Sequence, residues 1–408
     1  MKRRSRVMIR AFALALALTM LLCSCGFSPA QKTKVPTTYP YVFVHGLNGY
    51  GDDSKLPVSY WGGPGGSLLE ALKTEGYLCF APTVSAAGSA WDRACELYAA
   101  ITGAQVDYGA AHSAAYGHDR FGSTYDTALL PDWGTVDGNG NLRKLNLIAH
   151  SFGGATARLF CSLLQNGSPE ERDAAARGGG SVSPLFEGGK GDWIFSLTCL
   201  AAPHNGVSLL ALVDANSIMT LVGRLLGNVE IDQILASAGV TMSGHSLGEI
   251  LQAAKTEDTA YYDLTLDGAK LVNQTARLCP ETYYFSYPVD GTDENGRSTD
   301  DMGALLGLLA TLISSFTAQA NLDDDWKPND GLVNTISATY PFGQAKQEVT
   351  DANLLGPASL QPASWYVMPT VRGDHGSIVG LGRTLEQTLP LYSEQMARID
   401  ALSRQVTG

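Results

Sequence analysis

Basic residues are scarce in this chain of 408 residues, which has 28 lysines and arginines against 40 aspartates and glutamates and a formal net charge of −12. Residues 1–24 hold five cations and no acid, so their removal would give −12 − 5 = −17. A chain this acidic is a poor candidate for binding nucleic acid or an anionic membrane surface.

Cysteine is also rare, and no two cysteines have CxxC spacing. Beyond Cys23 and Cys25 the number is odd, which gives no disulfide framework. The remaining cysteines are expected to be small core residues, because most lie in apolar runs: Cys79, Cys95, Cys161, Cys199 and Cys279.

The apolar stretch near the N-terminus, "AFALALALTMLL", is too short for an ordinary membrane-spanning helix. It follows the cationic "MKRRSRVMIR", and the pair predicts an export signal over residues 1–25. The signal ends in "LCSCG", which resembles a bacterial lipobox and predicts lipidation of Cys25; the alternative is plain cleavage near "FSPA". We expect an exported chain, secreted or anchored to the cell membrane as a lipoprotein, with a flexible tether over residues 26–38.

Residues 39–408 show no internal repeat and are expected to form one α/β domain. Strand patterns alternate with helical patterns, as in βαβ units. The strand candidates are "YPYVFV", "LCFAPTV", "LNLIA", "WIFSLTCLAAP", "TYYFSYP" and "SWYVMPT". The helix candidates are "SLLEALKTEGY", "WDRACELYAAITG", "ATARLFCSLL" and the stretch from Leu391 to Leu402. Short, wholly apolar strands such as "LNLIA" are typical of a buried parallel sheet. "VDYGAAHSAAYGHDRFG" has no sustained period and is predicted to be a long ordered loop.

Apolar segments over residues 207–256, and "DMGALLGLLATLISSF" after them, suggest further helices. They are either ordinary core helices or, in an enzyme that works at an interface, helices covering the active site. We expect the first region to be a helical lid.

Two serines lie in patterns typical of a hydrolase nucleophile elbow, a strained turn between a strand and a helix. "GHSLG" around Ser246 matches G-x-S-x-G literally, but "ASAGVTM" before it is broken by glycine and poor in strand formers. "AHSFG" around Ser151 has alanine first, yet it lies between the strand "LNLIA" and the helix "ATARLFCSLL". We therefore predict that Ser151 is the nucleophile and that the chain has an α/β-hydrolase fold with a central, mostly parallel sheet and helices on both faces.

The partners of such a serine follow in the order Ser, Asp or Glu, His. Of the seven histidines, His245 and His375 lie well downstream, and His375 follows the last strand candidate, where the base is expected. The acid is sought in "DDDWKPNDGLVN", which offers Asp323, Asp324, Asp325 and Asp330; we choose Asp330, which precedes "LV". Backbone N–H groups of Phe152 and Leu47 are expected to form the oxyanion hole.

The chain resembles the secreted true lipases of the staphylococcal and thermophilic-bacillus type. The likeness runs through most of residues 40–380, in motifs such as "VFVHGLNGYG", "WDRACELYA", "AHSFGGATARLF", "APHNGVSL", "WKPNDGLVNTIS" and "DHGSIVG". It implies hydrolysis of triacylglycerols and other carboxylic esters, with Ser151, Asp330 and His375 at the positions of that family's triad. The alternatives are a carboxylesterase or phospholipase without interfacial activation, and a non-catalytic surface binding protein on a hydrolase scaffold.

The resemblance also implies metal sites. Asp92, His112, His118 and Asp258 match the family's structural zinc ligands, a closed set of four with no open catalytic position. Calcium is doubtful, because Ser377 and Gly382 stand where the family has carboxylate ligands. Phe152 replaces the usual glutamine after the nucleophile and is expected to alter the acyl pocket.

Overall fold

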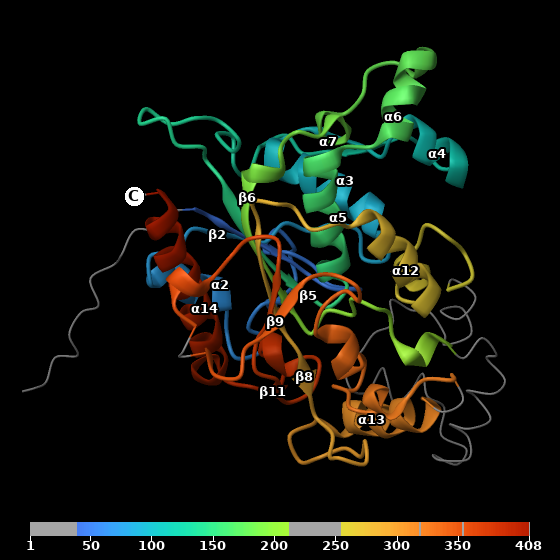
Figure 1. Cartoon of the computed structure of the whole chain (residues 1–408), viewed down its shortest axis with the longest axis vertical. Helices are drawn as coiled ribbons and strands as arrows, with labels where there is room; N and C mark the ends of the chain where they lie inside the picture. The colour runs from blue at the N-terminus through green and yellow to red at the C-terminus, as the bar shows by residue number, and fades with distance from the viewer. Residues whose placement is uncertain (1–38, 212–253, 318–319, 353–354, 408) are drawn as a thin grey trace, which may run out of the picture. The chain divides into compact units, whose positions relative to one another are not determined.

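A parallel sheet organises the part of the chain that this computed structural model describes, residues 39–211, 254–317, 320–352 and 355–407. Its seven strands run in the order β2-β1-β5-β6-β7-β10-β9, and every neighbouring pair is parallel (Figure 1). The strands are β1 (Tyr41–Val44), β2 (Cys79–Phe80), β5 (Leu145–His150), β6 (Ile194–Leu200), β7 (Tyr283–Tyr287), β9 (Lys346–Glu348) and β10 (Trp365–Val367). The prediction of an α/β fold with a mostly parallel sheet is confirmed.

Alternating side chains of the strands feed two cores, one on each face of the sheet. In β1, Val42 and Val44 belong to one core, whereas Tyr41 and Phe43 belong to the other. The first core packs under α3 (Ala90–Thr102) and α5 (Gly153–Asn166), and the second under α2 (Leu68–Thr74) and α14 (Leu385–Thr407). The sheet is therefore covered on both faces, as Figure 1 shows.

The predicted helix α3 begins and ends at residues with local capping chemistry. Ser89 caps α3 by accepting a hydrogen bond from the Asp92 N–H, and Gly103 ends the helix in the left-handed conformation that glycine adopts without steric cost. The other helices are α4 (Ala110–Tyr116), α6 (Pro169–Ala174), α7 (Pro184–Glu187), α11 (Ala260–Asp263), α12 (Leu266–Thr275) and α13 (Ala304–Phe316).

The structure differs from the prediction between β2 and β5. The segment expected to be an irregular loop contains α4 between β3 (Gln105–Asp107) and β4 (Phe121–Thr124), which pair antiparallel. These elements are too short for a sustained period in the sequence. The strand in "LCFAPTV" is also shorter than expected, and the C-terminal helix is longer.

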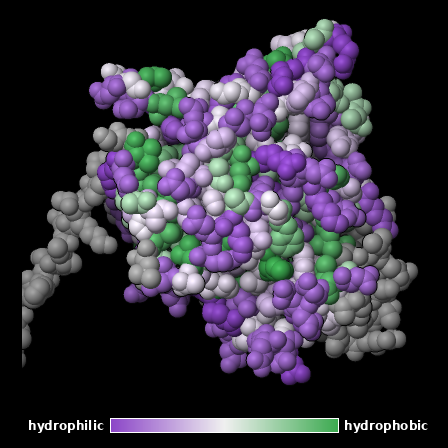
Figure 2. Space-filling view, viewed as in Figure 1, coloured by the Kyte–Doolittle hydropathy of each residue, from purple (hydrophilic) through white to green (hydrophobic). Residues whose placement is uncertain are grey.

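Several predictions fall outside the described residues: the export signal, the tether, Cys25, Ser246, His245 and nearly all of the lid region. Of that region the structure describes only residues 207–211 and 254–256. No helix among the described residues is long and apolar enough to cross a membrane. On the face drawn in Figure 2, hydrophilic residues predominate and hydrophobic ones lie in small separate groups. All five cysteines of the described part are buried and unpaired, as expected.

Candidate active site and metal centre

Ser151 lies in a sharp turn between β5 and α5. Its φ of 55° is the left-handed conformation, uncommon for a residue with a side chain, and its N–H donates to the Leu200 carbonyl at 2.9 Å. Two glycines allow the turn. A Cβ on Gly153 would lie 2.3 Å from the Val44 carbonyl oxygen, and one on Gly46 would lie 2.7 Å from the Cβ of Ser151. The strand, turn and helix predicted around Ser151 therefore have the geometry of an elbow.

Ser151, His375 and Asp330 meet although they are far apart in the sequence. His375 Nε2 is 2.8 Å from Ser151 Oγ, and His375 Nδ1 is 2.7 Å from Asp330 Oδ2. A carboxylate accepts, so Nδ1 carries the proton and the lone pair of Nε2 points at the serine. This arrangement can remove a proton from the hydroxyl group.

The Asp330 carboxylate is held from both sides. Asp330 is fully buried, and its Oδ1 accepts from the backbone N–H groups of Leu332 at 3.0 Å and Val333 at 2.7 Å. The backbone N–H of His375 also donates to the Asp330 carbonyl at 2.9 Å. The other acids considered from the sequence, Asp323, Asp324 and Asp325, are exposed.

The expected oxyanion donors lie in the two loops beside Ser151. Neither the Leu47 N–H nor the Phe152 N–H donates a hydrogen bond to another described residue. N–H groups in such loops are of the type that stabilises a developing negative charge in ester hydrolysis. The Phe152 ring is fully buried and belongs to the first core. An effect of this residue on the acyl pocket stays a prediction.

A buried arginine that the sequence analysis did not single out supports these loops. Arg93 of α3 donates to the carbonyl oxygens of His45 and Gly46, and its guanidinium lies over the Phe152 ring at 5.3 Å. Burial lowers the pKa of Arg93 to about 10, which still leaves it charged at neutral pH. The Gly46 carbonyl and the Leu47 N–H belong to one peptide unit, so the cation polarises this donor. The sequence could have indicated this role of Arg93 only through the position of an arginine on the face of a predicted helix that packs on the core.

A second cluster brings together the four residues predicted to bind metal. One ligand atom from each of Asp92, His112, His118 and Asp258 lies within 4.8 Å of the other three. His112 Nε2 is 3.3 Å from Asp92 Oδ1 and 3.1 Å from Asp258 Oδ1. These buried atoms, together with His118 Nε2, form no hydrogen bond of good geometry with the residues that the structure describes. Buried polar atoms without partners are costly, so the group could hold a metal ion.

The electrostatics of this cluster also favour a cation. Burial lowers the pKa of His112, but the carboxylates of Asp258 and Asp92 outweigh burial and raise it to about 9. His118 Nδ1 is 2.9 Å from the Asp119 carbonyl oxygen, which can only accept, so Nε2 is left with its lone pair facing the carboxylates.

Residues outside the cluster orient His112. The Glu171 carboxylate accepts from the backbone N–H groups of Ala111 at 3.0 Å and His112 at 2.7 Å, at the start of α4. The Trp91 ring stacks on the His112 ring at 5.0 Å. This explains why so short a helix forms here.

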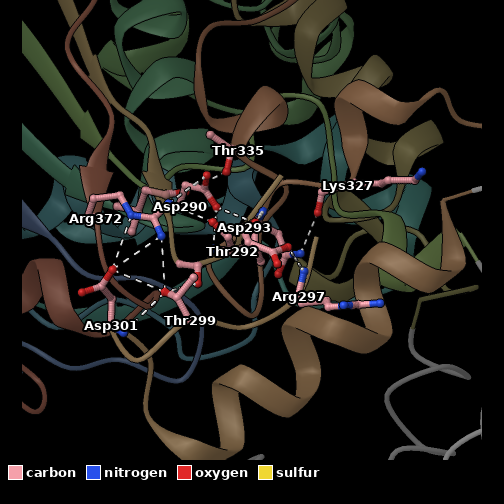
Figure 3. A network of polar contacts seen from close by, with 12 residues as sticks. Asp290, Thr292, Asp293, Arg297, Thr299, Asp301, Lys327, Thr335 and Arg372 are labelled. Atoms are coloured by element: carbon pink, nitrogen blue, oxygen red, sulfur yellow. Dashed lines mark hydrogen bonds and ion pairs between the residues drawn. The ribbon is translucent and has the colours of Figure 1, made fainter. Parts of the chain in front are cut away.

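A polar network fastens the segment that leads to His375. Figure 3 shows Arg372, of β11 (Val371–Arg372), pointing into the loop after β8 (Val289–Asp290). Its guanidinium donates to the Thr292 carbonyl at 3.0 Å and lies 3.3 Å from Asp290 Oδ2 and 3.5 Å from Asp301 Oδ2. The loop before His375 is thus held against the loop after β8 by the contacts of Arg372.

Ser377 and Gly382 stand at the two positions where the resemblance led us to expect no calcium-binding carboxylate. Ser377 Oγ donates to the Asp374 carbonyl at 2.7 Å, and Gly382 has a left-handed φ of 70°.

Comparisons with known proteins agree with this fold. The family "Lipase-like, C-terminal domain" matches residues 37–388. A lipase of Staphylococcus epidermidis is 35% identical over an alignment of 373 residues, and the match covers 87% of this chain and 52% of that protein. The chain spans about half the length of the curated relatives it matches.

Two solved structures match this chain over nearly all of their own length. The Staphylococcus hyicus lipase has a TM-score of 0.73 at 30% identity and covers 92% of this chain and 99% of its own. Lipase 1 from Pelosinus fermentans has a TM-score of 0.68 at 33% identity, and the match covers 88% of this chain and 99% of that chain. With its elbow, its parallel sheet and these matches, the chain belongs to the family of lipase-like C-terminal domains.

Proposed function

We propose that this chain hydrolyses carboxylic esters as a triacylglycerol lipase, with Ser151 as nucleophile. The observation that carries the proposal is the continuous line from Asp330 through His375 to a serine at a strained elbow, with separations of 2.7 and 2.8 Å. The lipid substrate is supported by relatives whose names say lipase.

In the proposed reaction His375 Nε2 takes the Ser151 proton as Oγ attacks the ester carbonyl. The tetrahedral oxyanion is stabilised by the N–H groups of Leu47 and Phe152. His375 then protonates the leaving alcohol, which departs and leaves an acyl ester on Ser151. Water, deprotonated by the same imidazole, attacks the acyl ester, and the imidazolium returns the proton to Ser151 Oγ as the fatty acid leaves. Asp330 keeps the proton on Nδ1 and stabilises the imidazolium in both steps.

The test compares two serines. Ser151→Ala is expected to lower turnover of a soluble ester by about 10⁴- to 10⁶-fold and to abolish labelling by a fluorophosphonate probe. Ser246→Ala is expected to remain active and labelled. The reverse result from this pair would refute the choice of nucleophile.

A chain-length series would separate the substrate classes. A triacylglycerol lipase is expected to prefer emulsified long-chain triglycerides, whereas an esterase would prefer short soluble esters. A wild-type protein that neither reacts with the probe nor hydrolyses any ester would favour the non-catalytic binding protein.

We propose further that Asp92, His112, His118 and Asp258 hold a structural zinc ion. Two imidazoles and two carboxylates suit the tetrahedral preference of Zn²⁺, and one ligand atom from each of the four residues lies within 4.8 Å of the others. The bound ion would supply a cross-link between α3, the α4 segment and the residues before α11. Four protein ligands leave no position for substrate.

Export with a lipid anchor on Cys25 also stays a proposal, supported by the cationic and apolar N-terminal sequence. Cys25→Ser is expected to abolish incorporation of radiolabelled palmitate in a bacterial host, and equal labelling of both proteins would contradict the anchor.

A further inference from the structure

Three hydrogen bonds connect the two loops on either side of Ser151. The Gly46 N–H donates to Tyr60 Oη at 2.9 Å, Tyr60 Oη is 2.6 Å from His150 Nδ1, and His150 Nε2 is 3.0 Å from the His375 carbonyl oxygen. Gly46 precedes Leu47, and His150 precedes Ser151. The line therefore joins the oxyanion loop to the histidine loop through the strand that carries the nucleophile.

Donors and acceptors match in only one direction along this line. A backbone carbonyl only accepts, so His150 Nε2 carries the proton. His150 Nδ1 must then accept from the Tyr60 hydroxyl, and the Tyr60 oxygen accepts from Gly46. Each group is satisfied with a neutral imidazole, whereas a second proton on His150 would deprive the Tyr60 hydroxyl proton of its acceptor.

The surroundings keep the imidazole neutral. His150 is 3% exposed, and burial, together with the nearby His375, lowers its pKa well below the usual value. The His150 ring also lies 4.7 Å from the His375 ring. His150 is thus an uncharged residue held by hydrogen bonds, and its ring packs against the ring of His375.

Both backbone groups of His375 are consequently tied down. Its N–H donates to the Asp330 carbonyl at 2.9 Å, and its carbonyl accepts from His150. The position of the His375 side chain has little tolerance, because proton transfer requires Nε2 to stay near its distance of 2.8 Å from Ser151 Oγ. Small displacements at such a distance cost large factors in rate.

We propose that His150 and Tyr60 are positioning residues that fix the loop of His375 relative to the loop of Leu47. This inference rests on the proposed ester hydrolysis. Neither residue touches a reacting atom, since their polar atoms are used on Gly46 and on the His375 carbonyl.

The experiment removes the middle of the line with Tyr60→Phe, which keeps the ring and deletes one hydroxyl. The matched control is Tyr50→Phe: Tyr50 packs edge-on against Tyr60, and its hydroxyl donates to the Val58 carbonyl at 2.8 Å, outside the line. With a soluble ester, Tyr60→Phe is expected to lower kcat about 10- to 100-fold with KM within about twofold, because positioning acts on the transition state. Tyr50→Phe is expected to match wild type.

A second pair of variants tests the other end and serves even if Tyr60→Phe does not fold. His150→Gln keeps an N–H donor near the position of Nε2, whereas His150→Asn keeps polar groups only near the position of Nδ1. The glutamine variant is expected to retain at least about five times more kcat than the asparagine variant, at similar thermal stability.

The outcomes separate the two proposals. A wild-type protein that neither hydrolyses esters nor reacts with a fluorophosphonate would refute the proposed function. An active wild type in which Tyr60→Phe equals Tyr50→Phe, or in which His150→Asn retains as much kcat as His150→Gln, would overturn the positioning role alone.

Discussion

Asp330 shows how one carboxylate can be made specific for one partner. Oδ1 is occupied by two backbone donors, so only Oδ2 is free to bond to His375. In Asp330→Asn the amide group would either present a donor to Nδ1 or turn its oxygen away from the backbone. Either result disturbs the tautomer that the serine needs.

We therefore expect Asp330→Asn to lower kcat by about 10⁴-fold while the protein stays folded. The matched control is Asp323→Asn, which changes an exposed acid of the same segment and should leave kcat unaltered. Steady-state kinetics on a soluble ester would measure both, and equal activity of the two variants would show that Asp330 has no part in the reaction.

A second buried acid, Asp400 of α14, affects stability. Tyr41 Oη is 2.8 Å from Asp400 Oδ1 and 3.0 Å from the Met396 carbonyl oxygen, and one hydroxyl proton cannot serve both acceptors. Burial raises the pKa of Asp400 from 3.8 to about 6, although the hydrogen bond from Tyr41 and the charge of Arg404 lower it.

Because the folded state has the higher pKa, it binds the extra proton between about pH 4 and pH 6, and stability is lost as the pH rises through this window. Asp400→Asn has no such proton. Its free energy of unfolding relative to wild type should therefore increase by about 2 to 3 kcal/mol between pH 4 and pH 7. Urea unfolding at both pH values would measure this, with the exposed Asp267→Asn as control. A difference in the free energy of unfolding between Asp400→Asn and wild type that does not change with pH would contradict the raised pKa of Asp400.

At the scale of elements, β11 depends on one side chain to stay on the loop after β8. Arg372 contacts that loop at a carbonyl and at two carboxylates, as Figure 3 shows. It is about half exposed, so each ion pair alone contributes little, but the contacts share one planar guanidinium.

We expect Arg372→Gln to lower the free energy of unfolding by about 1 kcal/mol and to reduce kcat, because Gly373 to His375 follow directly. Arg143→Gln removes a single exposed ion pair with Asp132 and should cost less than about 0.5 kcal/mol. Denaturant unfolding and ester kinetics would compare the two. If both variants behave alike, the network does not hold the histidine loop.

At the scale of the whole molecule, the group of two aspartates and two histidines proposed to bind zinc brings together segments that are distant in the chain. Asp92 lies in α3, His112 in α4, and Asp258 just before α11, where it has a left-handed φ of 64°. A ligand that binds only the folded state stabilises it by mass action.

Removal of metal by a chelator is expected to lower the unfolding temperature by about 5 °C or more, and added Zn²⁺ to restore it. Elemental analysis should find about one zinc per chain, as a single tetrahedral site requires. His118→Ala should unfold at the same temperature with and without chelator. An unchanged unfolding temperature of the wild type after verified metal removal would argue against a structural site.

Much of this organisation was predictable where the signal is local. The strand, turn and helix around Ser151 follow from an apolar run, small residues and a helical period within about twenty neighbouring positions. The short α4 was not predictable, because the carboxylate that holds its first turn belongs to Glu171, far along the chain. The contacts of Arg93, Tyr60 and His150 were not predicted for the same reason: their partners lie far along the chain.

The sequence by itself determined the elements of the sheet, the elbow and a short list of acids and histidines, since each depends on spacing between near neighbours. The choice of Asp330 and the grouping of two aspartates with two histidines were predictions from the sequence and its resemblance. Only the tertiary structure gave the contacts themselves, with Asp330 Oδ2 2.7 Å from His375 Nδ1 and the four ligand atoms within 4.8 Å of one another. The physical reason is that parallel strands bring loops from distant parts of the chain to the same edge of the sheet, where packing and burial select which polar groups meet.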